Sequence, residues 1–262
     1  MIEPLPLYPE GKIPFDEPSF EMTPTIQPFP LEGARGAVVV FPGGGYFQRS
    51  DLSEGERVAE AYNRAGFAAF VLRYRYRPYD GRAILADGQR AVRYARAYAQ
   101  TYGYSPDKIA VCGFSAGGHL AIITCEQDAP AYCGDEIDAC SARANALVLC
   151  YPVTTFKWDS YPPMPRIFLR EKKDDKALLA QYSFDYRIDA LPPTYAWYSK
   201  KDDAVLPEKN SIPLTAALKA AGTDVLCDAF SDGAHGIGLA HDFAECGTWH
   251  ARSVSFLRKH EF

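Results

Sequence analysis

A serine flanked by glycines is the residue of this sequence best placed to do chemistry. Ser115 is the centre of the stretch G-F-S-A-G at residues 113–117, between the apolar run 109–111 and a segment of helical character. A G-x-S-x-G pattern between strand and helix is typical of a sharp turn that exposes the serine hydroxyl at a helix N-terminus. Both glycines are needed, because a side chain at either would collide with the neighbouring strand or helix. Such a hydroxyl can attack an ester or amide carbonyl. The pattern also occurs by chance, so its meaning depends on partners elsewhere in the chain.

The first partner is a general base that takes the serine proton, and five histidines are available. We favour His235, because it lies in a glycine-flanked loop directly after the apolar strand expected at 224–230. His119 follows the serine by four residues, so its ring would lie one turn into the helix and point away from the hydroxyl. We interpret His119 as structural. His241 is the reserve candidate, and His250 and His260 lie on the expected closing helix.

The second partner is a carboxylate that fixes the tautomer of the base and stabilises its positive charge. Asp202 and Asp203 lie in the loop directly after the strand expected at 194–199. We favour Asp203, which stands four residues ahead of Pro207, and keep Asp202 as the alternative. The competing interpretation of this charged loop is an ordinary solvated turn. The order serine, aspartate, histidine is the one expected of α/β-hydrolases.

Three consecutive glycines at 43–45 follow the first expected buried strand. Attack on a carbonyl places negative charge on its oxygen, and each preorganised backbone N–H that binds this oxygen contributes about 3 kcal/mol. Glycines let the backbone curl close enough to supply such groups, and the amide of Ala116, next to the serine, should supply another. A phosphate-binding loop is the alternative. It is disfavoured because no G-x-G-x-x-G pattern continues and no Walker lysine follows.

Strands and helices that could position these residues alternate from residue 36 onward. Strands are expected at 36–41, 67–72, 108–112, 145–151, 194–199 and 224–230. Helices are expected at 54–65, 87–102, 119–125, 210–221 and 243–259. Near-continuous apolar strands between helices predict a mostly parallel central sheet with helices on both faces, an α/β fold of three layers. Ligands bind at the carboxyl ends of such strands, where the glycine triplet, Ser115, the two aspartates and His235 fall.

Two segments depart from this alternation within what we expect to be a single domain over residues 1–262. Residues 1–30 are rich in proline and predict an extended arm with one or two edge strands. Residues 152–190 are rich in proline, aromatic residues and charge. We expect this insertion to line or cover the pocket, and a surface excursion without function is the alternative.

Composition narrows the classes of function. A chain with 47% hydrophobic and 23% charged residues is typical of a soluble globular protein. Its formal charge of −5 argues against nucleic acid or an anionic membrane as partner. The N-terminus is acidic and broken by prolines, so we expect no signal peptide, and no apolar run is long enough to span a bilayer. Seven cysteines without zinc-site spacing favour reduced thiols and a cytoplasmic location. No residue pattern suggests a metal or cofactor.

With these residues assembled, the chain resembles the α/β-hydrolase esterases related to hormone-sensitive lipase, in the branch of acetyl esterases and xylan esterase-like proteins. The matching segments are PGGGY at 42–46, GFSAGGHL at 113–120, LPPT at 191–194, DD at 202–203 followed by Pro207 and by NS at 210–211, and GAHG at 233–236. One position departs from the lipase relatives, which carry histidine where Pro42 stands. This departure fits the carbohydrate-esterase branch better than the lipid branch.

The resemblance implies a role for each matching residue. Ser115 would be the nucleophile, His235 the base and Asp203 its orienting acid. The amides of Gly44, Gly45 and Ala116 would form the oxyanion hole.

The activity implied is that of a serine carboxylesterase that forms an acyl-enzyme. Its partner would be a small-molecule ester with a short acyl group, acetyl above all, and a sugar as the alcohol, as in acetylated xylo-oligosaccharides. Aromatic residues over 151–168 fit carbohydrate stacking and plain packing equally. The oligomeric state is left open, and the mechanism requires no metal or cofactor.

Two other functions share parts of this pattern. A peptidase of the prolyl-oligopeptidase type has the same turn and triad, but this chain lacks residues for a gating propeller. A non-catalytic relative with a binding role usually loses a triad member, and here all members are present.

Overall fold

The computed structural model describes residues 2–17, 19–127, 129–157, 163–184, 188–189 and 191–262. Within these ranges eight strands form one sheet in the order β1-β2-β4-β3-β5-β6-β7-β8. Strands β3 to β8 are parallel, and β2 pairs antiparallel with both β1 and β4. The strands are β1 Leu5–Pro6, β2 Thr25–Phe29, β3 Ala37–Phe41, β4 Ala68–Arg73, β5 Ile109–Phe114, β6 Ala146–Cys150, β7 Thr194–Ser199 and β8 Val225–Phe230.

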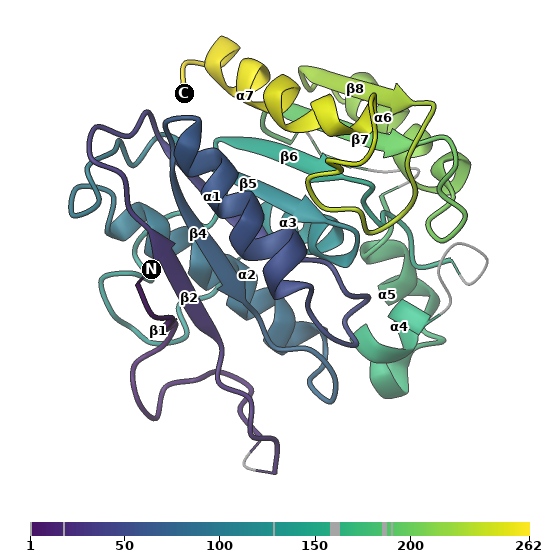
Figure 1. The fold of residues 1–262 in the computed structure, drawn as a ribbon. Helices are drawn as coiled ribbons and strands as arrows, with labels where there is room; N and C mark the ends of the chain where they lie inside the picture. The colour runs from purple at the N-terminus through teal and green to yellow at the C-terminus, as the bar shows by residue number, and fades with distance from the viewer. Residues whose placement is uncertain (1, 18, 128, 158–162, 185–187, 190) are drawn as a thin grey trace.

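Helices cover both faces of this sheet, as Figure 1 shows, with α1 and α7 in front and α2, α3 and α6 behind. They are α1 Arg57–Arg64, α2 Gly81–Ala97, α3 Ala116–Glu126, α4 Pro163–Phe168, α5 Lys176–Gln181, α6 Ser211–Ala220 and α7 Trp249–Lys259. Val38 packs toward α1 and Val39 toward α2 and α3, because successive strand side chains point to opposite faces. The expected three-layer α/β fold is confirmed. No helix in the described part of the chain is long and apolar enough to span a membrane.

Helices α2 and α7 begin farthest from where the sequence predicted. Helix α2 begins at Gly81 rather than at residue 87, because the Asp80 carboxylate accepts a hydrogen bond from the Arg82 amide and caps it. Helix α7 begins at Trp249 rather than at residue 243, after a short 3₁₀ turn. In the N-terminal arm, β1 and β2 form one edge of the sheet, as expected.

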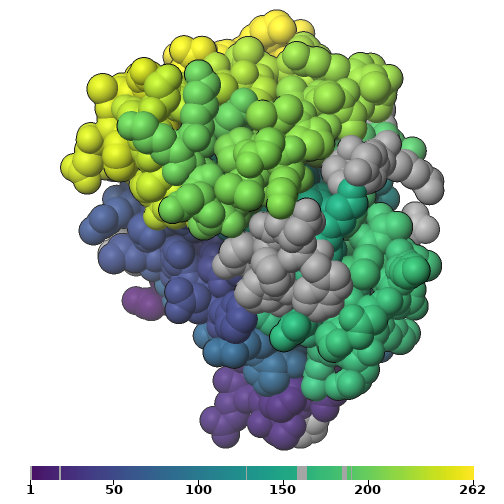
Figure 2. Space-filling view, turned by 90° about the vertical axis from the view of Figure 1, so that its right-hand side faces the viewer, coloured from purple at the N-terminus to yellow at the C-terminus, as the bar shows by residue number. Residues whose placement is uncertain are grey.

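The parallel strands bring their carboxyl ends to the same edge of the sheet, and the candidate residues follow there. The glycine triplet follows β3, Ser115 follows β5, and the acidic and histidine loops follow β7 and β8. Figure 2 views the molecule from the side toward which β5, β7 and β8 point in Figure 1. Residues of the insertion 163–184 (green) and of the region around α6 (yellow-green) lie on this side.

The insertion after β6 is only partly described. Its described helices α4 and α5 are short, and the Phe156, Phe168 and Phe184 rings pack around the His119 ring on α3. Trp158 and Tyr161, two of the aromatic residues over 151–168 that fit stacking and packing equally, lie outside the described residues. A role for residues 152–190 in lining the pocket stays a prediction.

Candidate active site

The turn between β5 and α3 has the geometry expected from its glycines. Ser115 has φ 51° and ψ −115°, a strained backbone conformation typical of a nucleophile at such a turn. A Cβ atom at Gly113 would lie 2.4 Å from the carbonyl oxygen of Gly117. A Cβ atom at Gly117 would lie 2.1 Å from the carbonyl oxygen of Phe41. Both glycines are therefore required, and the predicted collision with strand and helix is confirmed.

Ser115, His235 and an aspartate form one continuous chain of hydrogen bonds. Ser115 Oγ lies 2.8 Å from His235 Nε2, and His235 Nδ1 lies 2.7 Å from Asp202 Oδ2. Because a carboxylate only accepts hydrogen bonds, Nδ1 carries the proton and Nε2 is free to accept the serine hydroxyl. The Asp202 side chain is fully buried, whereas 19% of the His235 side chain is exposed. The arrangement can therefore accept a proton from the serine at a site that a substrate can reach.

The choice of Asp203 as the acid was wrong. Asp202 Oδ1 accepts hydrogen bonds from the amides of Ala204 and Val205, at 3.1 and 2.8 Å, so the loop wraps around this carboxylate. Asp203 is exposed to solvent. Counting residues back from Pro207 cannot separate two neighbours, because the local turn alone decides which side chain points inward.

The glycine triplet curls next to the nucleophile. Gly44 and Gly45 have φ of 128° and 63°, and a Cβ atom at Gly44 would lie 2.2 Å from the carbonyl oxygen of Gln48. The Gly43 amide donates to Glu54 Oε2 at 2.8 Å and is therefore already used. Ala116 is the first residue of α3, where helix N–H groups point outward. Amides of Gly44, Gly45 and Ala116 as oxyanion donors stay a prediction.

Glu54 and Tyr151 form a buried network that the sequence reasoning missed. Glu54 lies on the short π-helix Asp51–Glu56, and its Oε1 accepts a hydrogen bond from the Tyr151 hydroxyl at 2.7 Å. That hydroxyl accepts in turn from the Gly238 amide at 3.0 Å. The Tyr151 ring lies 4.9 Å from the His235 ring. Burial raises the pKa of Glu54, while the hydrogen bonds from Tyr151 and Gly43 and the charge of His235 lower it. From sequence alone, Glu54 is indistinguishable from a solvated residue in a first helical turn.

His119 is structural, as expected. Its Nδ1 lies 2.9 Å from the Tyr46 hydroxyl and its Nε2 lies 3.0 Å from the Tyr182 carbonyl oxygen. The carbonyl can only accept, so Nε2 carries the proton and Nδ1 accepts from the tyrosine. The ring stacks on Phe156 with centroids 4.4 Å apart. Burial lowers the pKa of His119 to about 4, so the ring is neutral near pH 7.

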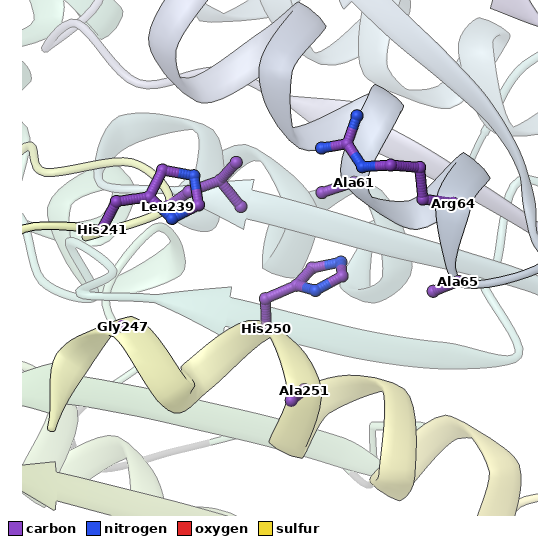
Figure 3. A pocket seen from close by; sticks show the side chains of 8 residues that line it. All are labelled: Ala61, Arg64, Ala65, Leu239, His241, Gly247, His250 and Ala251. Atoms are coloured by element: carbon purple, nitrogen blue, oxygen red, sulfur yellow. The ribbon is translucent and has the colours of Figure 1, made fainter. Parts of the chain in front are cut away.

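The reserve histidine lies in a different place. Figure 3 shows His241 and His250 beside Arg64 in a pocket of about 340 Å³ between α1 and α7. The lining residues are Ala61, Arg64, Ala65, Leu239, His241, Gly247, His250 and Ala251. Ser115 Oγ lies against His235 Nε2 instead, so the structure brings His235 and not His241 to the nucleophile. Burial lowers the pKa of His250 to about 4. In the described ranges, no three His, Cys, Asp or Glu side chains gather as metal ligands.

Comparison with known proteins places this chain in an esterase family. The BD-FAE family model matches residues 28–218. A curated acetylxylan esterase of Xylanibacter ruminicola is 29% identical over 222 residues, which cover 81% of this chain and 42% of that protein. Endo-1,4-beta-xylanase B of Butyrivibrio fibrisolvens is 32% identical over 215 residues, which cover 79% of this chain and 33% of that protein. The chain thus spans less than half the length of each of these relatives.

Solved structures agree in fold. The acetyl ester-xyloside bifunctional hydrolase of Caldicellulosiruptor lactoaceticus superposes with a TM-score of 0.92 at 32% identity, over 99% of this chain and 97% of that one. Est2, a thermophilic esterase of Thermogutta terrifontis solved with bound propionate, has a TM-score of 0.79 at 24% identity, over 99% and 94% of the chains. That second likeness shows the shared fold alone. The match over residues 28–218 and the near-complete superposition on the bifunctional hydrolase show that the chain belongs to the BD-FAE family of α/β-hydrolase esterases.

Proposed function

We propose that this chain is a serine carboxylesterase that removes short acyl groups, acetyl foremost, from carbohydrate esters such as acetylated xylo-oligosaccharides. The hydrogen-bonded chain from Ser115 through His235 to Asp202, with distances of 2.8 and 2.7 Å, carries the proposal. The carbohydrate part is supported by the acetylxylan esterase and the acetyl ester-xyloside hydrolase among the relatives.

The first half of the reaction would acylate the serine. As Ser115 Oγ bonds to the ester carbonyl carbon, its proton moves to His235 Nε2, and the carbonyl π electrons move onto the oxygen. Asp202 stabilises the positive charge on the imidazole through the 2.7 Å hydrogen bond at Nδ1. Amides of Gly44, Gly45 and Ala116 would bind the oxyanion. When the carbonyl re-forms, the bond to the sugar oxygen breaks, and that oxygen takes the proton from Nε2.

The second half would release the acid. Water bonds to the acyl carbon while its proton moves to His235 Nε2, which is the same acceptor as before. Collapse of this intermediate breaks the bond to Ser115 Oγ, which recovers its proton from the imidazole. The products are acetate and the free sugar hydroxyl.

A Ser115→Ala variant tests the mechanism. It should lose at least about 10³-fold in kcat/KM on p-nitrophenyl acetate, because it removes the hydroxyl that lies 2.8 Å from His235 Nε2. Ser141→Ala, in an exposed loop, is the matched control and should match the wild type. Activity retained in Ser115→Ala would overturn the mechanism.

The substrate is tested separately on the wild-type chain. Acetate release from acetylated xylo-oligosaccharides should exceed release from propyl or butyl acetate at equal concentration. A preference for p-nitrophenyl octanoate over p-nitrophenyl acetate would overturn the short-acyl part. Cleavage of simple acetate esters without cleavage of acetylated sugars would overturn the carbohydrate part.

A further inference from the structure

We propose that Glu54 is a positioning residue of the site, whose buried carboxylate holds the glycine triplet and the His235 loop in register with the nucleophile. This inference rests on the proposed esterase function. It adds a fourth side chain to the serine, histidine and aspartate, one that acts through other groups and does not itself touch the reacting atoms.

The first contact ties Glu54 to the glycine triplet. Glu54 Oε2 accepts the Gly43 N–H at 2.8 Å. A Cβ atom at Gly43 would lie 2.6 Å from that carboxylate oxygen and 3.1 Å from the Cβ of Ser115. The Gly43 backbone therefore lies between the carboxylate and the nucleophile, with no room for a side chain. After Gly43, the backbone has positive φ at Gly44 and Gly45, the predicted oxyanion donors. A shift of the carboxylate would move their N–H groups relative to Ser115.

The second contact ties Glu54 to the histidine loop. The Tyr151 hydroxyl donates to Glu54 Oε1 at 2.7 Å and accepts from the Gly238 amide at 3.0 Å. The ring of Tyr151 meets the His235 ring edge-on, with centroids 4.9 Å apart. Tyr151 itself has φ 37°, a strained conformation for a non-glycine residue. Loops that follow β3, β6 and β8 thus meet at one carboxylate.

Burying the Glu54 carboxylate costs free energy, which argues that it has a role in the site. Glu54 and Tyr151 are 2% and 1% exposed. A buried carboxylate is unfavourable unless hydrogen bonds or an opposite charge compensate for lost hydration. The charge of His235 lowers the pKa of Glu54, against the larger raising effect of burial. This attraction is mutual. The ionised Glu54 carboxylate is a second negative charge, in addition to that of Asp202, near the imidazolium that forms during attack.

Three buried side chains around Glu54 stay uncharged near neutral pH. Tyr74, Cys150 and Tyr151 face it from β6 and from the segment after β4, and burial is the main cause that raises the pKa of each. The charge of Glu54 raises all three further. His235 is therefore the facing group whose charge changes during the proposed reaction.

Glu54→Gln is the main test, assayed on p-nitrophenyl acetate across pH. Glutamine has the same shape, but it loses the charge and offers one acceptor where the network needs two. We expect kcat to fall about 10- to 100-fold, less than the loss from deleting an oxyanion donor, with KM changed less than about threefold. The acid limb of kcat/KM should move to lower pH, because a negative charge that favours the protonated ring is gone.

Two further variants separate charge from packing. Tyr151→Phe keeps the ring against His235 and removes the hydroxyl, so a smaller loss in kcat and an unmoved acid limb are expected. Glu56→Gln is the matched control on the same short helix, where Glu56 pairs with Arg73 at 2.8 Å at the partly exposed surface. Its kinetics should equal those of the wild type.

Rates are counted per active site by stoichiometric labelling of Ser115 with a fluorophosphonate, and folding is checked by circular dichroism. If Glu54→Gln does not fold, Glu54→Asp takes its place. That variant keeps the charge and loses reach, so it should lose kcat without moving the acid limb. Wild-type kcat in both Glu54→Gln and Tyr151→Phe would overturn the inference alone. A wild-type chain that cleaves none of the esters would instead overturn the proposed function, and this inference with it.

Discussion

Two histidines in this molecule have both ring nitrogens hydrogen-bonded, yet their surroundings give them opposite properties. His235 lies between Asp202 and the Ser115 hydroxyl, and 19% of its side chain is exposed. His119 lies between the Tyr46 hydroxyl and the Tyr182 carbonyl and is completely buried. One ring faces an ionisable carboxylate, whereas the other faces only neutral groups.

The difference shows that partners and access decide what a histidine can do, and that closeness in sequence does not. A proton added to His235 would be balanced by Asp202 at 2.7 Å. A proton added to His119 would find no such charge beside it, and burial lowers its pKa to about 4. His119 is only four residues from the nucleophile, but it holds α3 to the insertion through Tyr182. His235 is 120 residues away and holds the nucleophile itself.

Replacing each histidine should separate the two roles most sharply. His235→Ala should reduce kcat/KM on p-nitrophenyl acetate by at least about 10⁴-fold, because it removes the acceptor of the serine proton. His119→Gln should stay within about tenfold of the wild type per labelled Ser115, because its partners lie outside the proton path. Thermal unfolding should show the reverse order of damage. An inactive His119→Gln beside an active His235→Ala would invert the comparison.

The two neighbouring aspartates, Asp202 and Asp203, test whether the carboxylate beside His235 is what distinguishes it from His119. Asp202→Asn should cost about 10²- to 10⁴-fold in kcat, because an amide neither stabilises the imidazolium nor fixes the tautomer. Asp203→Asn removes an exposed carboxylate and should change kcat less than about twofold. Initial rates with p-nitrophenyl acetate measure both. Equal losses in the two variants would show that Asp202 does not act through its 2.7 Å contact with His235.

Features that depend on the local backbone could be predicted from the sequence. The turn at Ser115 was predictable because only glycine fits at positions 113 and 117, and steric exclusion leaves a clear mark in the sequence. The strands leading to the site were predictable for a similar reason, since strands buried on both faces must be apolar throughout.

Features that depend on distant partners could not be predicted. Glu54 is recognised only through its contacts with Gly43 and with Tyr151, 97 residues away, and Asp202 only through His235, 33 residues away. Arg90 and Arg93 are charged residues of the helix expected at 87–102, yet both are buried. Asp138 and backbone carbonyls of the segment 130–140 accept hydrogen bonds from their guanidinium groups. No local sequence pattern predicts these contacts.

The His119 half of the comparison predicts a specific dependence of stability on pH. Its pKa is about 4 in the folded chain against an ordinary value of 6.5, so only the unfolded chain binds this proton in between. The contribution of the neutral His119 ring to the free energy of unfolding is therefore fully present above pH 6.5. It is lost as the pH drops toward 4, by up to about 3 kcal/mol. His250 acts with the same sign. Urea unfolding should show that His119→Gln is less stable than the wild type by about 1–3 kcal/mol near pH 7.5. Below pH 6.5 the free energy of unfolding of this variant should decline less steeply with falling pH than that of the wild type. An unchanged slope would mean that His119 is protonated in the folded chain.

Tyr46→Phe should have the smallest effect of the changes around His119, since it removes only the hydroxyl that donates to His119 Nδ1 at 2.9 Å. The ring keeps its contacts with Tyr74 and Phe168, whose centroids lie 6.1 and 5.3 Å away. We expect a loss of about 1–2 kcal/mol in the free energy of unfolding and kcat/KM within about threefold of the wild type. In a double-mutant cycle with His119→Gln, the two losses should sum to more than the loss of the double variant, by about 0.5–1.5 kcal/mol. Strict additivity would mean that the hydroxyl does not fix the neutral ring, and that burial alone keeps His119 apart from His235.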